Sequence, residues 1–130
     1  MTGYRAYKGN EIESATPLQL VLLTYDALIR SLGMGRLAAL EGDIAAECQN
    51  LSKASDALLE LTGSLNHEVG GQMAANLAGL YTYMLRRLHE GLGSGNTDHI
   101  DEVLRLAQEL RSGWETISQQ SQPLRAVAAG

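Results

Sequence analysis

The chain has 130 residues, 45% of them hydrophobic and 19% charged, which suits one folded domain and excludes a disordered chain. Its net charge of −5 and pI of about 5.1 argue against nucleic-acid binding. Phe is absent and the only aromatic residues are one Trp and five Tyr, so the core must be aliphatic.

Cysteine usage and hydropathy indicate the compartment. Cys48 is the only cysteine, which excludes an internal disulfide and a cysteine-rich zinc site. The polar run from Tyr4 to Lys8 does not resemble a secretory signal. The run from Leu20 to Leu23 is far shorter than the ~20 apolar residues that cross a bilayer. We expect a cytoplasmic protein that does not insert into membranes.

Helical periodicity, interrupted by glycines, predicts an all-α fold. Four amphipathic segments with short connections favour an antiparallel four-helix bundle over residues 16–118. Residues 1–15 are expected to form a flexible N-terminal segment and residues 119–130 a flexible C-terminal tail. No segment has the strict alternation of a half-buried strand.

The first helix is expected to begin after Thr16, because Thr16, Pro17 and Gln19 match a capping box with proline at the first helical position. Gly33 and Gly35 weaken its last turns, each by about 1 kcal/mol relative to alanine. The apolar residues of its core face recur every three or four positions: Leu18, Val21, Leu22, Tyr25, Leu28, Ile29 and Leu32.

The second helix is expected after Gly42, with Asp43 as N-cap. Its main stripe is Ile44, Cys48, Leu51, Ser55, Leu58, Thr62 and Leu65, and Ala54, Leu59 and Leu61 widen this stripe on either side. The resulting sector of about 160° exceeds the ~100° stripe of an ordinary surface helix. A neighbouring helix or a partner protein must therefore cover it, and the pattern leaves both open.

The third helix is expected after Gly70 and Gly71, with His67 and Glu68 in the preceding turn and Gly91 as a C-cap glycine. Its stripe comprises Met73, Leu77, Leu80, Tyr81, Met84, Leu85 and Leu88, and Tyr83 points away from it.

The fourth helix is expected to start near Thr97 or Asp98 and to fade after Ser118, with a core face of Ile100, Val103, Leu104, Ala107, Leu110, Trp114 and Ile117.

No motif for catalysis or cofactor binding is visible. His67, His89 and His99 lack metal-ligand spacing and are expected at the surface. Cys48 lies on an apolar stripe and is expected to be buried and inert. The acidic residues at helix starts are explained by the helix dipole: Glu41, Asp43, Glu47, Asp98, Asp101 and Glu102. The glycines form no phosphate loop. We expect a protein that is not an enzyme and that needs no metal or cofactor.

Several motifs in order resemble the flagellar secretion chaperone family, FliS. The resemblance extends over about residues 4–117 and departs from the family at Gly33, Gly35 and the Gln-rich end. It is carried by the paired Tyr4 and Tyr7, the helix start at 15–17, the Leu-rich run 20–30, the turn 41–43, Gly70-Gly71 with the segment 76–88, and the last helix up to Trp114.

The resemblance implies a cytoplasmic chaperone that binds the disordered C-terminal segment of flagellin, prevents its premature polymerisation and keeps it competent for export. It implies no nucleotide or metal. A co-chaperone, an export-gate component or a flagellar regulator are further possible partners, and the chaperone itself is a monomer or a homodimer.

An amphipathic segment that folds on binding needs a long apolar groove. We expect the partner-binding surface on the wide face of the second helix and on the third helix, with the N-terminal segment covering the same groove in the free protein. The expected residues are Tyr4, Tyr7, Ile12, Leu51, Ala54, Leu58, Leu61, Leu65 and Tyr83. The alternative is a helical-bundle interaction or regulatory module that self-associates or binds another flagellar protein.

Overall fold

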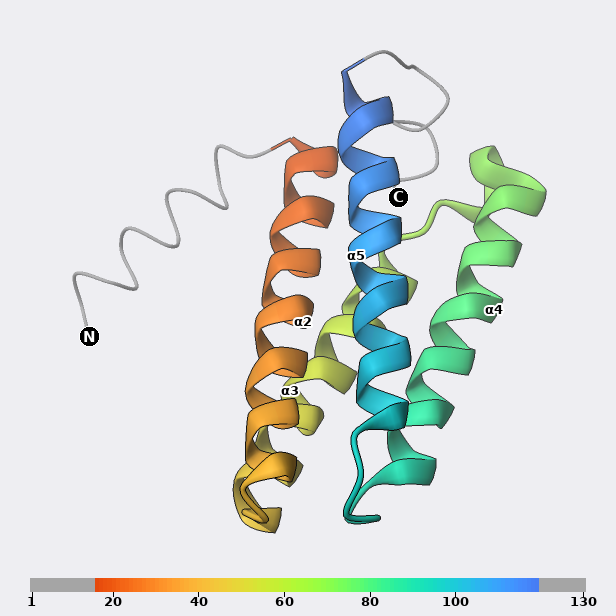
Figure 1. The fold of residues 1–130 in the computed structure, drawn as a ribbon. Coiled ribbons are helices and arrows are strands. Elements are labelled where there is room, and N and C mark those ends of the chain that lie inside the picture. The colour runs from red at the N-terminus through yellow and green to blue at the C-terminus, as the bar shows by residue number, and fades with distance from the viewer. Residues whose placement is uncertain (1–15, 120–130) are drawn as a thin grey trace, which may run out of the picture.

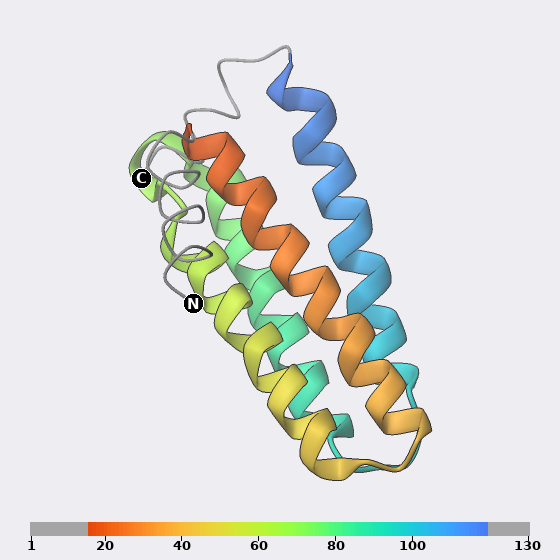
Figure 2. The same ribbon diagram turned by 90° about the vertical axis from the view of Figure 1, so that its left-hand side faces the viewer.

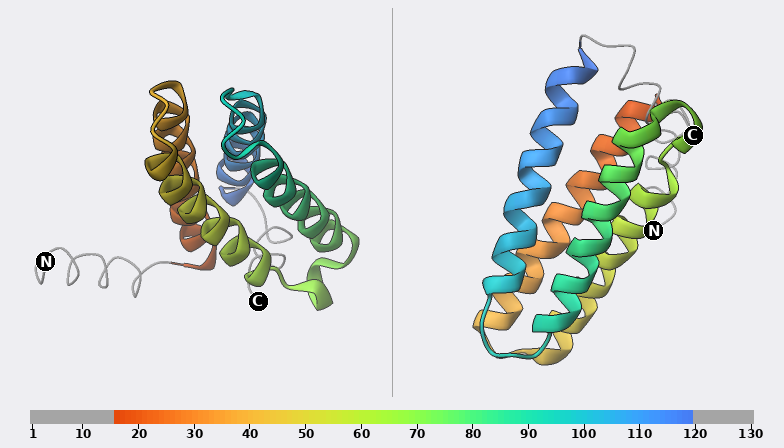
Figure 3. Two further views of the ribbon diagram at one scale, coloured as in Figure 1. Left: turned by 90° about the horizontal axis from the view of Figure 1, so that it is seen from below. Right: turned by 90° about the vertical axis from the view of Figure 1, so that its right-hand side faces the viewer.

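Four antiparallel helices make up the computed structural model, which describes residues 16–119 (Figure 1). They are α2 (Pro17–Leu40), α3 (Ile44–Gly63), α4 (His67–Gly91) and α5 (Asp98–Ser118). Each helix packs against the helices before and after it, and α5 returns to pack against α2 (Figures 2 and 3). The predicted all-α four-helix bundle is confirmed, and the described residues contain no strand.

The start of α2 follows the predicted capping box. The Thr16 hydroxyl accepts a hydrogen bond from the backbone N–H of Gln19 at 3.1 Å, and the Gln19 side chain accepts the backbone N–H of Thr16 at 2.8 Å. Two unpaired donors at the helix start are thereby satisfied. Despite Gly33 and Gly35, the helix continues to Leu40.

The turn from α2 into α3 depends on one glycine. Gly42 has φ of +72°, a conformation that costs a residue with a Cβ more than it costs glycine. The N–H groups of Gly42 and Asp43 donate to the carbonyls of Ala39 and Ala38, the pattern of a Schellman motif. Asp43 then caps α3 by accepting the N–H of Ala46, as predicted.

Helix α4 begins earlier than predicted and contains a kink. His67 and Glu68 lie in its first turn, capped by Asn66, and not in a preceding turn. Gly71 breaks the helix with φ of +52° and ψ of −126°, so the glycine pair that we expected to precede the helix lies inside it.

The core is aliphatic, as the composition requires, with one polar group of aromatic residues at its centre. The hydroxyls of Tyr25 on α2 and Tyr81 on α4 lie 2.7 Å apart, and the Trp114 side chain of α5 hydrogen-bonds to both. Burial raises the pKa of both tyrosines, so their hydroxyls stay protonated. Because α2 and α4 are diagonal partners, this hydrogen bond ties the two helices across the bundle.

The predicted faces of the first and fourth helices are largely correct. Leu18, Val21, Tyr25, Leu28 and Leu32 of α2 are buried, and so are four residues of the predicted α5 face: Ile100, Val103, Ala107 and Trp114. On α4, Tyr81, Met84 and Leu88 are buried, whereas Met73 is 45% exposed.

The predicted stripe of the second helix is wrong in its first two turns. Cys48 is exposed and Ile44 is 60% exposed, whereas Glu47 is 3% exposed. The Glu47 carboxylate accepts the backbone N–H of Gly93 at 3.2 Å, so its inward position satisfies an N–H in the loop after α4. Because a charged residue takes the inward position here, Cys48 turns to the surface.

Two further predictions fail at the α4–α5 connection. His99 is 1% exposed and lies in the core, whereas His67 and His89 are at the surface as expected. Gly91 is not a C-cap but the last residue of α4, and a Cβ on it would lie 2.1 Å from the His99 ring. Gly91 thus provides the space that the His99 ring occupies.

Two ion pairs join α5 to α2. Arg36 and Asp101 pair at 2.6 Å between α2 and α5, and Arg111 pairs with Asp26 at the same distance. Asp101 was attributed to the helix dipole alone, and it does lie in the first turn of α5. Its ion pair adds a second role that the pattern did not reveal.

Candidate functional site

Five of the predicted partner-binding residues lie in the core. Leu51, Ala54, Leu58, Leu61 and Leu65 are between 0% and 8% exposed, because α2 and α4 cover the wide face of α3 from either side. The wide sector is therefore explained by neighbouring helices within the chain. These residues offer little exposed surface in this conformation.

Tyr83 lies between α4 and α5 and is half-buried. Its hydroxyl donates to the Glu102 carboxylate at 2.5 Å, and Arg87 pairs with the same carboxylate at 2.6 Å. The hydrogen bond from Tyr83 lowers the pKa of Glu102, and Glu102 in turn raises the pKa of Tyr83. Tyr83 thus links two helices, and the Arg86 guanidinium lies 5.6 Å from the centre of its ring. The remaining predicted residues, Tyr4, Tyr7 and Ile12, lie outside the described residues.

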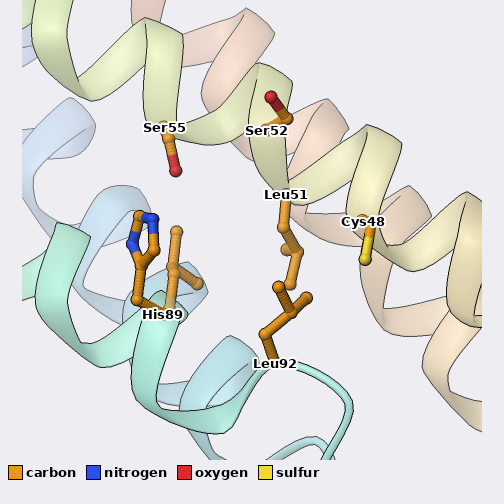
Figure 4. A pocket seen from close by; sticks show the side chains of 7 residues that line it. Cys48, Leu51, Ser52, Ser55, His89 and Leu92 are labelled. Atoms are coloured by element: carbon orange, nitrogen blue, oxygen red, sulfur yellow. The ribbon is translucent and has the colours of Figure 1, made fainter.

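A groove between α3 and α4 provides the exposed surface that the buried residues do not. It contains a depression of about 140 Å³ (Figure 4), and the buried side chains of Leu51 and Leu88 are among the residues that line it. Leu92 points toward Leu51 from the opposite wall, and the Ser55 hydroxyl faces the His89 ring. The lining residues are Cys48, Leu51, Ser52, Ser55, Leu88, His89 and Leu92.

Helical spacing extends this groove along α3. Residues separated by three or four positions share one face of a helix. The face that contains Cys48, Ser52 and Ser55 therefore also carries Ile44 and Leu59, which are 60% and 57% exposed. The groove side of α3 thus has two exposed aliphatic residues on either side of a small, weakly polar middle.

The chemistry of the groove suits an apolar guest. None of the residues that line the depression is Asp, Glu, Lys or Arg. The Nδ1–H of His89 donates to the Leu85 carbonyl at 2.9 Å, which leaves the other ring nitrogen as a polar group at the rim. Within residues 16–119, no group of three or more His, Cys, Asp or Glu could hold a metal ion.

The residues that the sequence predicts for partner binding on α3 face the core, whereas the groove lies on another side of the same helix. Leu59 was recognised as lying off the core stripe, while Ile44, Cys48 and Ser55 were assigned to the core. Periodicity did not reveal the true core side, because the polar Glu47 occupies a buried position four residues before Leu51.

Fold and groove together define an all-α bundle with an open apolar groove of the kind that accepts a helix of another protein. In the described part of the chain, no helix is long and apolar enough to span a membrane. Residues 1–121 match the family model for flagellar protein FliS, so the chain belongs to the FliS family.

Individual relatives agree with this assignment. The chain is 34% identical over 122 residues to the flagellar secretion chaperone FliS of Salmonella typhimurium, covering 90% of both proteins. It is 34% identical to the flagellar secretion chaperone FliSB of Pseudomonas aeruginosa, covering 83% of this chain and 86% of that one. For the flagellar secretion chaperone FliS of Vibrio cholerae, the identity is 28% and the coverage is 97% of this chain and 96% of that protein.

Proposed function

We propose that this chain is a cytoplasmic flagellar secretion chaperone that binds the C-terminal segment of flagellin in the groove between α3 and α4. The observation that carries the proposal is the apolar depression that Leu51 and Leu88 help to line, together with the exposed Leu59. Binding there keeps the segment from polymerising early and keeps it competent for export. The chaperone contributes surface and performs no chemical step.

The mechanism follows from the groove's shape and charge. An amphipathic segment that becomes helical on binding places apolar side chains every three or four residues on one face. One such side chain enters the depression between Cys48 and Leu92, and another, about three turns further along the guest helix, contacts Leu59 of α3. Ordering the segment costs conformational entropy, so the complex needs several such contacts along the groove.

The N-terminal segment remains part of the proposal. Tyr4, Tyr7 and Ile12 supply apolar side chains that cover the groove in the free protein and leave it when flagellin binds. Deletion of residues 1–14 is then expected to expose apolar surface to a reporter dye and to change the affinity for flagellin. If the deletion changes neither, the segment does not cover the groove.

Calorimetric titration with a peptide of the last ~40 residues of flagellin tests the groove directly; at 1.5 Å per residue, such a peptide is long enough to follow it. The variant Leu59→Asp places a charge on an exposed groove residue and is expected to weaken binding at least tenfold. Met73→Asp is the matched control, because Met73 is 45% exposed on α4 and does not line the depression.

The two parts of the proposal fail separately. If the peptide does not bind the unmodified chain, the proposed function is wrong. If the peptide binds and Leu59→Asp changes its affinity no more than Met73→Asp does, the function stands and the groove is the wrong site.

A further inference from the structure

Two buried ionisable side chains lie where the loop after α4 meets α3 and α5. Glu47 of α3 is 3% exposed and His99 of α5 is 1% exposed. Apart from the core tyrosines, they are the only buried ionisable residues in the described part of the chain. The proposed binding of a guest in the groove uses neither of them, so their burial requires another explanation.

The Glu47 carboxylate ties the loop 92–97 to α3. It accepts the backbone N–H of Gly93 at 3.2 Å, and among residues 16–119 no other hydrogen bond joins this loop to α3. The other hydrogen bonds of the loop run to α4 and α5, with which it is continuous in the chain. Gly93 is exposed, so water can bond its N–H if the carboxylate leaves.

The His99 ring is fixed in place, but one of its nitrogens has no partner. A Cβ on Gly91 would lie 2.1 Å from the ring, so the ring packs directly against the backbone of α4. Within the described residues, Nε2 of His99 is the only buried side-chain nitrogen or oxygen without a hydrogen bond. A neutral ring carries no charge to compensate, whereas a protonated ring has two N–H donors and a buried charge that needs an anion.

Charged groups of α3, α4 and α5 act on His99. Burial lowers the pKa of His99 below its ordinary value, and Glu47 opposes burial more strongly than any other charged group does. Arg87 of α4 lowers the pKa further, whereas Asp101 and Asp98 of α5 raise it. His99 is therefore mostly neutral at pH 7 and becomes protonated as the pH falls below 6.5.

Of the three acidic residues that act on His99, Glu47 is the one that a protonated ring can recruit. Asp101 already pairs with Arg36 of α2 at 2.6 Å. Asp98 is exposed to water, where an ion pair contributes little. Glu47 is buried, takes part in no ion pair among residues 16–119, and bonds an N–H that water can bond instead.

The loop that Glu47 holds also forms one wall of the groove. Leu92 immediately precedes Gly93 and points across the depression toward Leu51 (Figure 4). On the opposite wall, Cys48 immediately follows Glu47 and lines the same depression. Release of the loop from α3 therefore moves a groove wall.

We propose that Glu47 and His99 form a latch that one proton from solvent operates and that sets the width of the groove. While the ring is neutral, Glu47 holds Gly93 and thereby keeps Leu92 against the depression. Once the ring is protonated, Glu47 pairs with it, water bonds the N–H of Gly93, and the loop 92–97 moves away from α3. The latch acts on the shape of the groove and does not depend on whether flagellin binds there.

Nuclear magnetic resonance of the isotope-labelled full chain, between about pH 8 and pH 5, tests the latch without any substitution. The ring signals of His99 report its protonation, and the amide signal of Gly93 reports the hydrogen bond to Glu47. Cross-relaxation between the methyl groups of Leu92 and Leu51 reports the position of the wall. We expect all three to change with one midpoint below pH 6.5, and the methyl cross-relaxation to fall at least about twofold.

Three glutamine variants identify the groups. His99→Gln removes the site of protonation, whereas Glu47→Gln keeps an acceptor for the N–H of Gly93 but offers the ring no charge. In both variants the Gly93 amide signal is expected to stay unchanged across the pH range. His89→Gln is the matched control, because His89 is an exposed histidine that lines the same depression, and its variant is expected to keep the transition.

Any one of five results would overturn the proposal. The Gly93 amide keeps its signal while His99 titrates; the transition survives in His99→Gln or in Glu47→Gln; it is lost in His89→Gln; or the methyl contact of Leu92 persists after Gly93 has moved. The fifth is a loss of helical circular dichroism with the same midpoint, which would mean that the whole chain unfolds and not the loop alone.

Discussion

The two sides of α3 differ in how closely the neighbouring helix approaches. Toward α2, Gly35 brings the backbones so close that a Cβ on it would lie 2.8 Å from the Leu51 side chain. Toward α4, the same helix leaves an open depression lined by serines, Cys48 and His89. The α2 side of α3 is thus closely packed, and the α4 side keeps an open depression. The comparison separates a side that stabilises the fold from the side that we propose binds flagellin.

The largest expected effect comes from replacing the buried Leu61 with aspartate. The matched comparison is the same replacement at the exposed Leu59, two positions away. Leu61 is 1% exposed and Leu59 is 57% exposed. Leu61→Asp removes a core side chain and buries a charge, so we expect a loss of at least about 4 kcal/mol of unfolding free energy. Leu59→Asp is expected to change it by no more than about 0.5 kcal/mol. Urea unfolding followed by circular dichroism measures both.

Equal destabilisation by the two variants would contradict the distinction between a packed side and an open side. Leu61 is buried, whereas the sequence predicts that it lies on the partner surface. A well-folded Leu61→Asp variant would reinstate that view.

A smaller effect tests the packed side alone. Gly35→Ala forces Leu51 to move, and we expect a loss of about 1–3 kcal/mol. Gly79→Ala is the control, because Gly79 is an exposed residue of α4 with nothing within 4 Å of the added methyl group, and it is expected to gain up to about 1 kcal/mol. Melting temperatures compared at one pH are sufficient. A stabilising Gly35→Ala would mean that α2 and α3 are not tightly packed there.

The smallest expected effect is the pH dependence of stability that His99 of α5 produces. Its ring lies against Gly91 at the end of α4. Burial lowers the pKa of His99 in the folded state, against the opposing effect of Glu47 on α3; Arg87 lowers it further, and Asp101 and Asp98 raise it. The unfolded histidine takes up its proton near pH 6.5, before the folded one does. Stability is therefore present above pH 6.5 and falls as the pH drops toward the lower folded pKa, by at most about 1.4 kcal/mol per pH unit.

Unfolding free energies measured between pH 7.5 and 5.5 check this dependence. His99→Gln is expected to flatten the slope relative to the unmodified chain, whereas His89→Gln, at an exposed histidine, is expected to leave it unchanged. An unchanged slope in His99→Gln would mean that His99 is equally easy to protonate in the folded and unfolded chains.

Local signals in the sequence were sufficient for the fold class and for the starts of α2, α3 and α5, but not for the start of α4. Thr16 and Asp43 cap helices as predicted, because capping depends on residues within one turn. Periodicity could not predict which side of α3 faces the core in its first turns. Glu47 points inward there and accepts the N–H of Gly93, which is distant in the sequence. The groove was missed for the same reason: which part of a wide apolar sector is covered depends on how distant helices pack.

Gly91 and His99 have a consequence for any attempt to vary this protein. Because the His99 ring occupies the space where a Cβ at position 91 would be, the two positions cannot be changed independently. In a randomised library of both positions, alanine or a larger residue at 91 should survive selection only together with a smaller side chain at 99. Positions 91 and 99, eight residues apart in the sequence, are therefore expected to covary.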